Sequence, residues 1–202
     1  MPIRERAALP LLALEKRSGT ESIHFAGKRL GKSVLDFWQW AWSDLVDNTH
    51  RGVFAEYLVA LALGVDGSVR RDGAAWDLTA QDGTRVEVKA SGVIQSWGQR
   101  KPSTPRFSVR AAEGWDPASG TWDQNEARHA DVYVFCLHHH REKESADPTD
   151  VSQWTFWVLA AETLNRELGG QKSISVPGLE KLGASKVPYA ELRAAVEAAR
   201  HT

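Results

Sequence analysis

The chain has 202 residues, 42% hydrophobic and 25% charged, which is the composition of one ordinary globular domain. Its formal net charge of −1 excludes a polycation that coats nucleic acid or an anionic membrane along its whole length, so any nucleic-acid contact must be local. A single cysteine, Cys136, excludes an intramolecular disulfide, and with no apolar run of about 18 residues we expect a cytoplasmic protein without a membrane partner.

The first half of the chain predicts helices before strands. Residues 1–32 give a weak pattern, and we expect an N-terminal arm or a short helix with a loop there. Ser33 and Asp36 form a capping pair ahead of a helix whose apolar residues are interpreted as core rather than as base-stacking surfaces. These residues, at helical spacing, are Val34, Leu35, Trp38, Trp42 and Leu45. A second helix is expected over 50–64, ending at Gly64.

The second half predicts a sheet. Short strands are expected at 68–72, 74–80 and 84–90, followed by a long connection and a further strand at 106–110. Two nearly continuous apolar runs, 130–137 and 154–160, predict buried central strands. After these runs come the segment 161–168, a short strand expected at 172–176 and a last helix expected from about Pro188. This order predicts an α/β fold, a central mixed β-sheet flanked by helices.

The segment WDLTAQDGTRVEVKAS, residues 76–91, reads as a hairpin with charges inside its strands. A two-residue loop at Asp82 and Gly83 would put the polar face of one strand beside the apolar face of the other. A three-residue loop, with Gly83 in the left-handed position, keeps all apolar residues together. We therefore predict the three-residue loop, which places Asp77 directly opposite Glu87.

That register puts like charges side by side, because opposed residues hold their Cβ atoms about 4.5–5.5 Å apart. A divalent cation between Asp77 and Glu87 would offset the repulsion, and hard oxygen ligands suit Mg²⁺ or Mn²⁺. Lys89 lies on the same face two residues on and could orient a water or stabilise charge on a phosphate. The competing interpretation is a surface hairpin whose charges only keep it soluble.

The spacing of Asp77 and Glu87-Val88-Lys89 resembles the signature of the PD-(D/E)xK nuclease superfamily, although Trp76 stands where the signature has proline. The resemblance covers about 48–137 and implies a restriction-endonuclease-like three-layer core, with 138–202 extending the sheet and adding helices. It also implies Mg²⁺-dependent hydrolysis of phosphodiester bonds, with Asp77, Glu87 and the Val88 carbonyl as metal ligands and Lys89 serving the attacking water. Many members place a further ligand on the preceding helix, and Glu56 matches that position. The alternative for Glu56 is a carboxylate at the rim of the helix that faces solvent.

Basic residues gather between Arg85 and Arg110, with Glu87 as the only acid among them. Clusters of this kind bind phosphates, although a solvated basic loop would have the same composition. The side chains expected to contact nucleic acid are Ser91, Gln95, Arg100, Lys101 and Arg106.

Three functions compete for these residues. The first is a metal-dependent endonuclease acting on DNA, in restriction, repair or recombination, and the sequence leaves open whether a homodimer supplies a second active site. The second is a non-catalytic nucleic-acid-binding module on the same fold, which would not need Asp77, Glu87 and Lys89 together. The third, a retaining glycosidase, would use a carboxylate pair about 5 Å apart but gives Lys89 no role.

Overall fold

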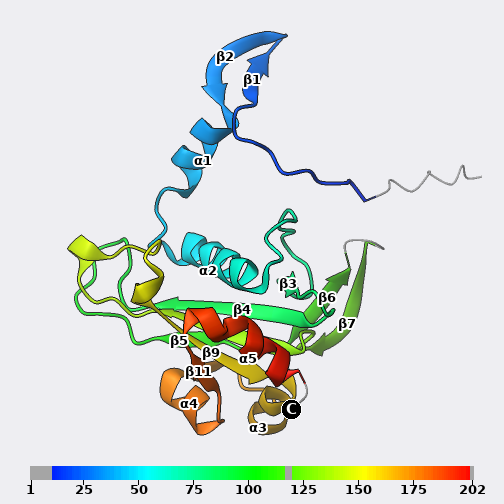
Figure 1. Cartoon of the computed structure of the whole chain (residues 1–202), viewed down its shortest axis with the longest axis vertical. Coiled ribbons are helices and arrows are strands. Elements are labelled where there is room, and N and C mark those ends of the chain that lie inside the picture. Colours follow the sequence, from blue (N-terminus) through cyan, green and yellow to red (C-terminus); the bar gives the residue numbers. More distant parts are fainter. Residues whose placement is uncertain (1–10, 117–119, 201–202) are drawn as a thin grey trace, which may run out of the picture.

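The central feature of the computed structural model, which describes residues 11–116 and 120–200, is a five-stranded mixed sheet with the order β11-β9-β8-β4-β3. Its strands are β3 (Leu78–Thr79), β4 (Arg85–Gly92), β8 (Val132–His138), β9 (Trp154–Ala160) and β11 (Ser185–Val187). β4 and β8 are parallel, and the other neighbours are antiparallel. The predicted α/β architecture with a mixed sheet is therefore present (Figure 1).

Four helices cover the two faces of this sheet: α2 (Asn48–Leu63), α3 (Ala161–Leu168), α4 (Val176–Lys181) and α5 (Leu192–Ala199). A further helix, α1 (Val34–Trp42), lies away from the sheet (Figure 1), and the 3-10 turns are η1 (Lys143–Ser145), η2 (Val151–Gln153) and η3 (Tyr189–Glu191). α2 and α5 pack on one face, while α3, α4 and the ladder of β5 (Arg106–Ser108) with β10 (Ser173–Ser175) pack on the other. No helix in the described residues has both the length and the apolar composition needed to cross a bilayer.

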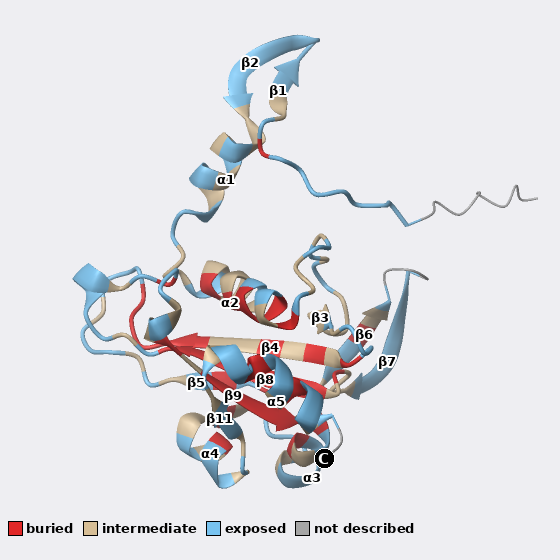
Figure 2. Ribbon diagram, viewed as in Figure 1, coloured by how far each residue is buried: buried red, intermediate tan, exposed pale blue. Residues whose placement is uncertain are grey.

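The centre of the sheet follows from the apolar runs. All seven residues of β8 are buried, because its Val132, Val134 and Cys136 contribute to one core while Tyr133 and Phe135 contribute to the other. β9 spans the predicted residues 154–160 and is also almost wholly buried (Figure 2). Strands enclosed on both faces have no polar alternation, so these two predictions are confirmed.

The hairpin has the predicted three-residue loop. Leu78 pairs with Val86, and the Ala80 amide donates to the Thr84 carbonyl at 2.8 Å, which leaves residues 81–83 as the loop. Gly83 has φ +86°, the left-handed conformation that this loop requires. The first strand is shorter than expected, because residues 74–77 bend instead of extending the ladder.

Several elements differ from the sequence prediction. Residues 68–72 form a loop rather than a strand. A hairpin of β6 (Ala112–Asp116) and β7 (Thr121–Ala127) was not predicted, because most of its residues are polar and exposed. A cross-strand contact holds this hairpin, in which the Trp115 and Trp122 rings lie 5.1 Å apart. Such a pair becomes visible only after the register is known. α4 and β11 were also not predicted.

The chain before α2 forms a hairpin and a helix that project from the sheet, and we call residues 18–42 the hairpin–helix arm (Figure 1). β1 (Ser22–Phe25) pairs with β2 (Lys28–Ser33), which leads directly into α1. The predicted capping box of Ser33 and Asp36 is confirmed. The predicted core role of the apolar residues of α1 is wrong, because every residue of this helix is at least partly exposed.

Replacing Gly83 with alanine tests the hairpin loop. A Cβ on Gly83 would meet nothing within 4 Å, so the whole cost comes from the left-handed backbone, about 1 kcal/mol of unfolding free energy. Gly98→Ala is the control, because Gly98 also has open space but no left-handed backbone conformation. Urea unfolding that gives equal stability for both variants would contradict the loop conformation.

Candidate functional site

Asp77 lies at the bend just before β3, beside the middle of β4. Its Oδ2 accepts a hydrogen bond from the Val88 amide at 2.7 Å, and its own amide donates to the Val86 carbonyl at 3.1 Å. The amide and carbonyl of one residue point to the same side of an extended strand. The Val88 carbonyl, predicted as a metal ligand, therefore also faces the side of Asp77.

Glu87 and Lys89 lie on one face of β4, next to Tyr133 and Phe135 of β8. Their side chains are only 17% and 28% exposed, and the Lys89 ammonium donates to the Glu87 carboxylate. The ladder ends at the pair of Leu78 with Val86, so Asp77 lies just beyond it, close enough to Glu87 and Lys89 for both charges to act on its pKa. The structure thus brings the three predicted catalytic residues together at the free side of β4.

The pKa of Asp77 is raised from 3.8 to about 6. The largest cause is burial of the carboxyl group, and the second is the negative charge of Glu87. The Val88 amide, Lys89 and Arg70 oppose the shift without cancelling it. At neutral pH the ionised Asp77 is therefore short of positive charge, which is the condition that a bound cation would relieve.

Glu56 comes from α2 and is 12% exposed. It lies close enough to Asp77 and Lys89 for their charges to affect its pKa, which is raised mainly by burial. Its two carboxylate oxygens accept from Arg70, at 3.0 Å for the Nη2 contact. The predicted further ligand is therefore near the other three residues, but an arginine holds it.

Arg70 is the residue that sequence reasoning missed. It lies in the loop between α2 and β3, where it bridges Glu56 and the Asp72 carboxylate, the latter at 3.1 Å. Its pKa is raised above the ordinary value, chiefly by the hydrogen bonds to Glu56. The sequence carries no local signal for this role, because the partner of Arg70 lies fourteen residues away on α2.

The residues predicted to contact nucleic acid are split between interior and surface. Ser91 and Gln95 are buried. The Gln95 side chain accepts from Arg51 at 3.1 Å and donates to the Gly92 carbonyl at 3.2 Å. These bonds hold the loop after β4 and leave Gln95 little surface for a ligand.

Arg100, Lys101 and Arg106 are exposed, as a phosphate-binding role requires. Arg100 and Lys101 lie in the loop that follows the carboxyl end of β4. Arg106, at the start of β5, donates to the Ser173 hydroxyl at 2.9 and 3.2 Å. Their contact with nucleic acid stays a prediction.

The site has enough oxygen ligands only for a hard cation that needs few ligands from the protein. In the described residues there is no group of three or more His, Cys, Asp or Glu side chains arranged to hold a metal ion. Mg²⁺ commonly uses only one or two carboxylates and keeps several waters. Asp77, Glu87 and the Val88 carbonyl meet that smaller requirement, while Glu56 could join only after leaving Arg70.

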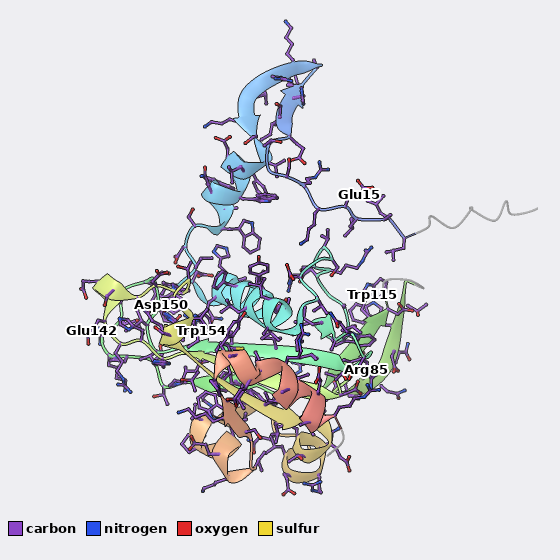
Figure 3. All side chains as sticks on the ribbon, viewed as in Figure 1. Glu15, Arg85, Trp115, Glu142, Asp150 and Trp154 are labelled. Atoms are coloured by element: carbon purple, nitrogen blue, oxygen red, sulfur yellow. The ribbon has the colours of Figure 1, made fainter. Side chains whose placement is uncertain are left out.

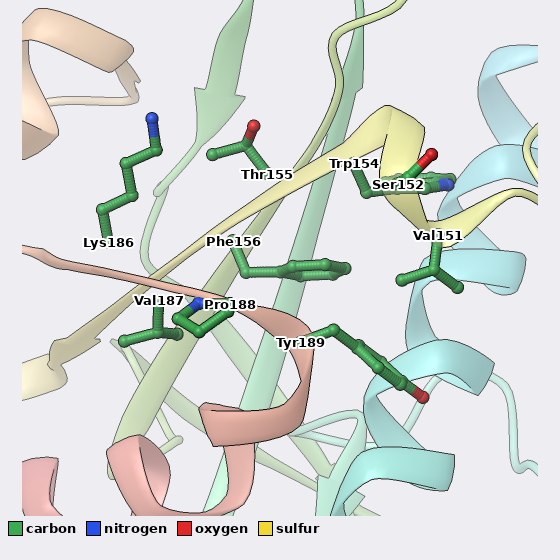
Figure 4. Close-up of a pocket in the computed structure, with 9 residues that line it drawn as sticks. All are labelled: Val151, Ser152, Trp154, Thr155, Phe156, Lys186, Val187, Pro188 and Tyr189. Carbon is green, nitrogen blue, oxygen red and sulfur yellow. The ribbon is translucent and has the colours of Figure 1, made fainter.

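A cavity of about 530 Å³ lies at the other edge of the sheet, between β9, β11, η2 and η3 (Figure 4). Phe156, Val187 and Tyr189 are among its lining residues, and none of the acids described above contributes to it. Figure 3 labels Arg85, the first residue of β4, on one side of the molecule and Glu142, Asp150 and Trp154 on the other. The acid cluster and the cavity are therefore separate sites.

No known protein family matches the chain, and no curated protein is similar to it.

Asp77→Asn should stabilise the metal-free protein at pH 7.5 by about 1–3 kcal/mol. Because the folded pKa of about 6 lies above 3.8, the destabilisation by ionised Asp77 is present above about pH 6 and disappears as the pH falls towards 4. Urea unfolding in EDTA at pH 7.5 and pH 4 measures both values.

Asp131→Asn is the matched control for this measurement. Arg85 lowers the pKa of Asp131, so its replacement should destabilise the protein at pH 7.5, the opposite sign. A loss of stability for Asp77→Asn at pH 7.5 would show that Asp77 is not short of positive charge.

Proposed function

We propose that the protein is a metal-dependent nuclease that hydrolyses phosphodiester bonds of DNA at the Asp77–Glu87–Lys89 site. The observation that supports this most is the raised pKa of Asp77, caused by burial and by Glu87. Strongly perturbed acids beside a specific charge partner are typical of functional sites. A hairpin whose charges only kept it soluble would not need to bury two acids beside one another.

The acids and the lysine divide the work. Asp77, Glu87 and the Val88 carbonyl would hold Mg²⁺ or Mn²⁺, which lowers the pKa of water and polarises a phosphate when bound. The Lys89 ammonium, already on the Glu87 carboxylate, would orient the attacking water and stabilise charge on the phosphate oxygens. Water attack on phosphorus then breaks the bond to the leaving sugar oxygen, which takes up a proton.

The arrangement of elements also supports the resemblance to PD-(D/E)xK nucleases and their restriction-endonuclease-like fold. α2 precedes the hairpin, and β4 pairs with the parallel strand β8 in the same sheet. One feature departs from the expected order, because strands β5, β6 and β7 connect β4 to β8 where the superfamily has a helix. The acids and their hairpin, rather than the connection, therefore support the proposal.

A non-catalytic nucleic-acid-binding module is the second candidate, and one observation favours it. Glu56 and Glu87 are already paired with Arg70 and Lys89, so two of the three acids are neutralised by the protein itself. A site of this kind could be retained for contact without turnover. The two candidate functions differ in one expectation. In the nuclease a metal ion displaces Arg70 and Lys89 from the acids, and in the binding module it does not.

Cleavage of plasmid and oligonucleotide DNA in Mg²⁺, Mn²⁺ or EDTA tests the nuclease. We expect cleavage only with a divalent ion, and a fall of about 100-fold or more for Lys89→Ala and Asp77→Asn, since positioned proton-transfer groups and ligands contribute at least that much. RNA substrates of the same sequence report the substrate class.

Lys181→Ala, an exposed lysine on α4, is the control and should cleave like the wild type. Cleavage that survives EDTA, or both site substitutions, would remove the proposed mechanism. Tight binding to DNA without cleavage in any metal would support the binding module instead.

Arg70→Ala should strengthen Mn²⁺ binding about tenfold, because it removes a positive charge and frees the Glu56 carboxylate. Isothermal titration calorimetry measures the affinity. Arg71→Ala is the matched control, since its guanidinium donates to the Leu12 carbonyl at 3.0 Å rather than to an acid of the site. Equal affinities for the two variants would mean that Glu56 is not a ligand.

A further inference from the structure

The hairpin–helix arm exposes large apolar side chains although its backbone is ordered by a strand pair and a capped helix. Trp40 is 84% exposed and Phe25 is 74% exposed, with Leu30 and Phe37 each about half exposed. The capping box starts α1, and Trp38 packs within 3.0 Å of where a Gly19 Cβ would lie. The arm is thus ordered without burying its aromatic residues, which is unusual for a surface that faces only water.

A second apolar surface lies on the body of the same chain. It consists of the 530 Å³ cavity beside β9 and β11, together with Tyr57 of α2, which is 49% exposed. Tyr189, at the rim of the cavity, donates to the Leu58 carbonyl of α2 at 2.8 Å and so joins the two parts (Figure 4). We call this the acceptor surface.

The excess charges around the two surfaces differ in sign. β1 and β2 carry Lys28, Arg29 and Lys32, of which Lys32 is paired with Asp36 of α1, so the excess positive charge of the hairpin comes from Lys28 and Arg29. The loop 141–150, which leads into η2 at the cavity, has four acids against two bases. The four acids, all exposed, are Glu142, Glu144, Asp147 and Asp150. Complementary charge of this kind favours correct pairing of two surfaces.

We propose that two copies of this chain form a symmetric dimer in which the hairpin–helix arm of each copy covers the acceptor surface of the other. The arm does not cover its own acceptor surface, because it projects away from the sheet (Figure 1). A second copy supplies both missing partners at once. Because the contact is reciprocal, the dimer has twofold symmetry, and further copies do not add to it to form a filament.

The area agrees with a stable dimer. Four exposed apolar side chains of the arm present on the order of 500 Å², taking about 150–250 Å² for each aromatic. A reciprocal exchange buries one arm and also one acceptor surface on every chain, so the area buried on each chain exceeds that of the arm alone. A stable interface needs about 800 Å² from each partner. Because the arm is already ordered, association loses little further conformational entropy.

Light scattering coupled to size-exclusion chromatography of the full chain tests the dimer. We expect twice the chain mass for the wild type. Trp40→Ser on the arm and Tyr57→Ser on the acceptor surface should each weaken self-association at least tenfold, since buried aromatic anchors dominate interfaces. Trp122→Ser is the control, because Trp122 is 59% exposed on β7, outside both surfaces. Circular dichroism verifies that every variant folds.

Mixing the two site variants separates arm exchange from other dimers. A mixed dimer of Trp40→Ser and Tyr57→Ser chains keeps one intact arm on one intact acceptor surface, so mixing should restore part of the dimer that neither variant forms alone. Failure of mixing to restore any dimer would overturn the exchange, and a Tyr57→Ser variant that dimerises like the wild type would indicate arm-to-arm packing instead. A monomeric wild type, or a dimer unaffected by either substitution, would also overturn it, whether the arm then folds back or binds another macromolecule.

Discussion

The three-residue loop at 81–83 is the constraint on which the candidate site depends. It sets the pairing of Leu78 with Val86, which leaves Asp77 just before the ladder and close enough to Glu87 for that charge to raise the Asp77 pKa. A shift by one residue would send one acid to the other face of the sheet. The repulsion between the two acids is a cost that the fold accepts, with Lys89, Arg70 and the Val88 amide offsetting part of it. The cation proposed for this site would offset the remaining repulsion.

The hairpin and the central strands could be predicted because local rules decide them. Gly83 fixes the loop, and apolar alternation fixes the register. The apolar runs of β8 and β9 can be satisfied only inside a sheet with both faces covered. Glu56, Asp77, Glu87 and Lys89 follow from the same pattern together with the family resemblance.

What could not be predicted depends on contacts between distant residues. Arg70 is positioned by Glu56, fourteen residues away, so no local pattern identifies its role. Gln95 is predicted from the sequence to contact nucleic acid, yet its side chain is buried against Arg51, forty-four residues away. The aromatic residues of α1 have the spacing of a core helix, and the sequence does not say whether the surface that covers them belongs to the same chain. The β6–β7 hairpin is held by one tryptophan pair among polar residues.

Arg51 connects two segments of the protein that are far apart in the sequence. Its guanidinium is fully buried and, instead of a carboxylate, bonds the Val46 and Ile94 carbonyls at 2.9 and 3.1 Å, with further bonds to Asn48 and Gln95. Gly92 leaves the room for it, since a Cβ there would come within 2.5 Å of Nη1. One side chain therefore links the segment between α1 and α2 to the loop that follows β4, so a displacement of either segment would break hydrogen bonds of Arg51.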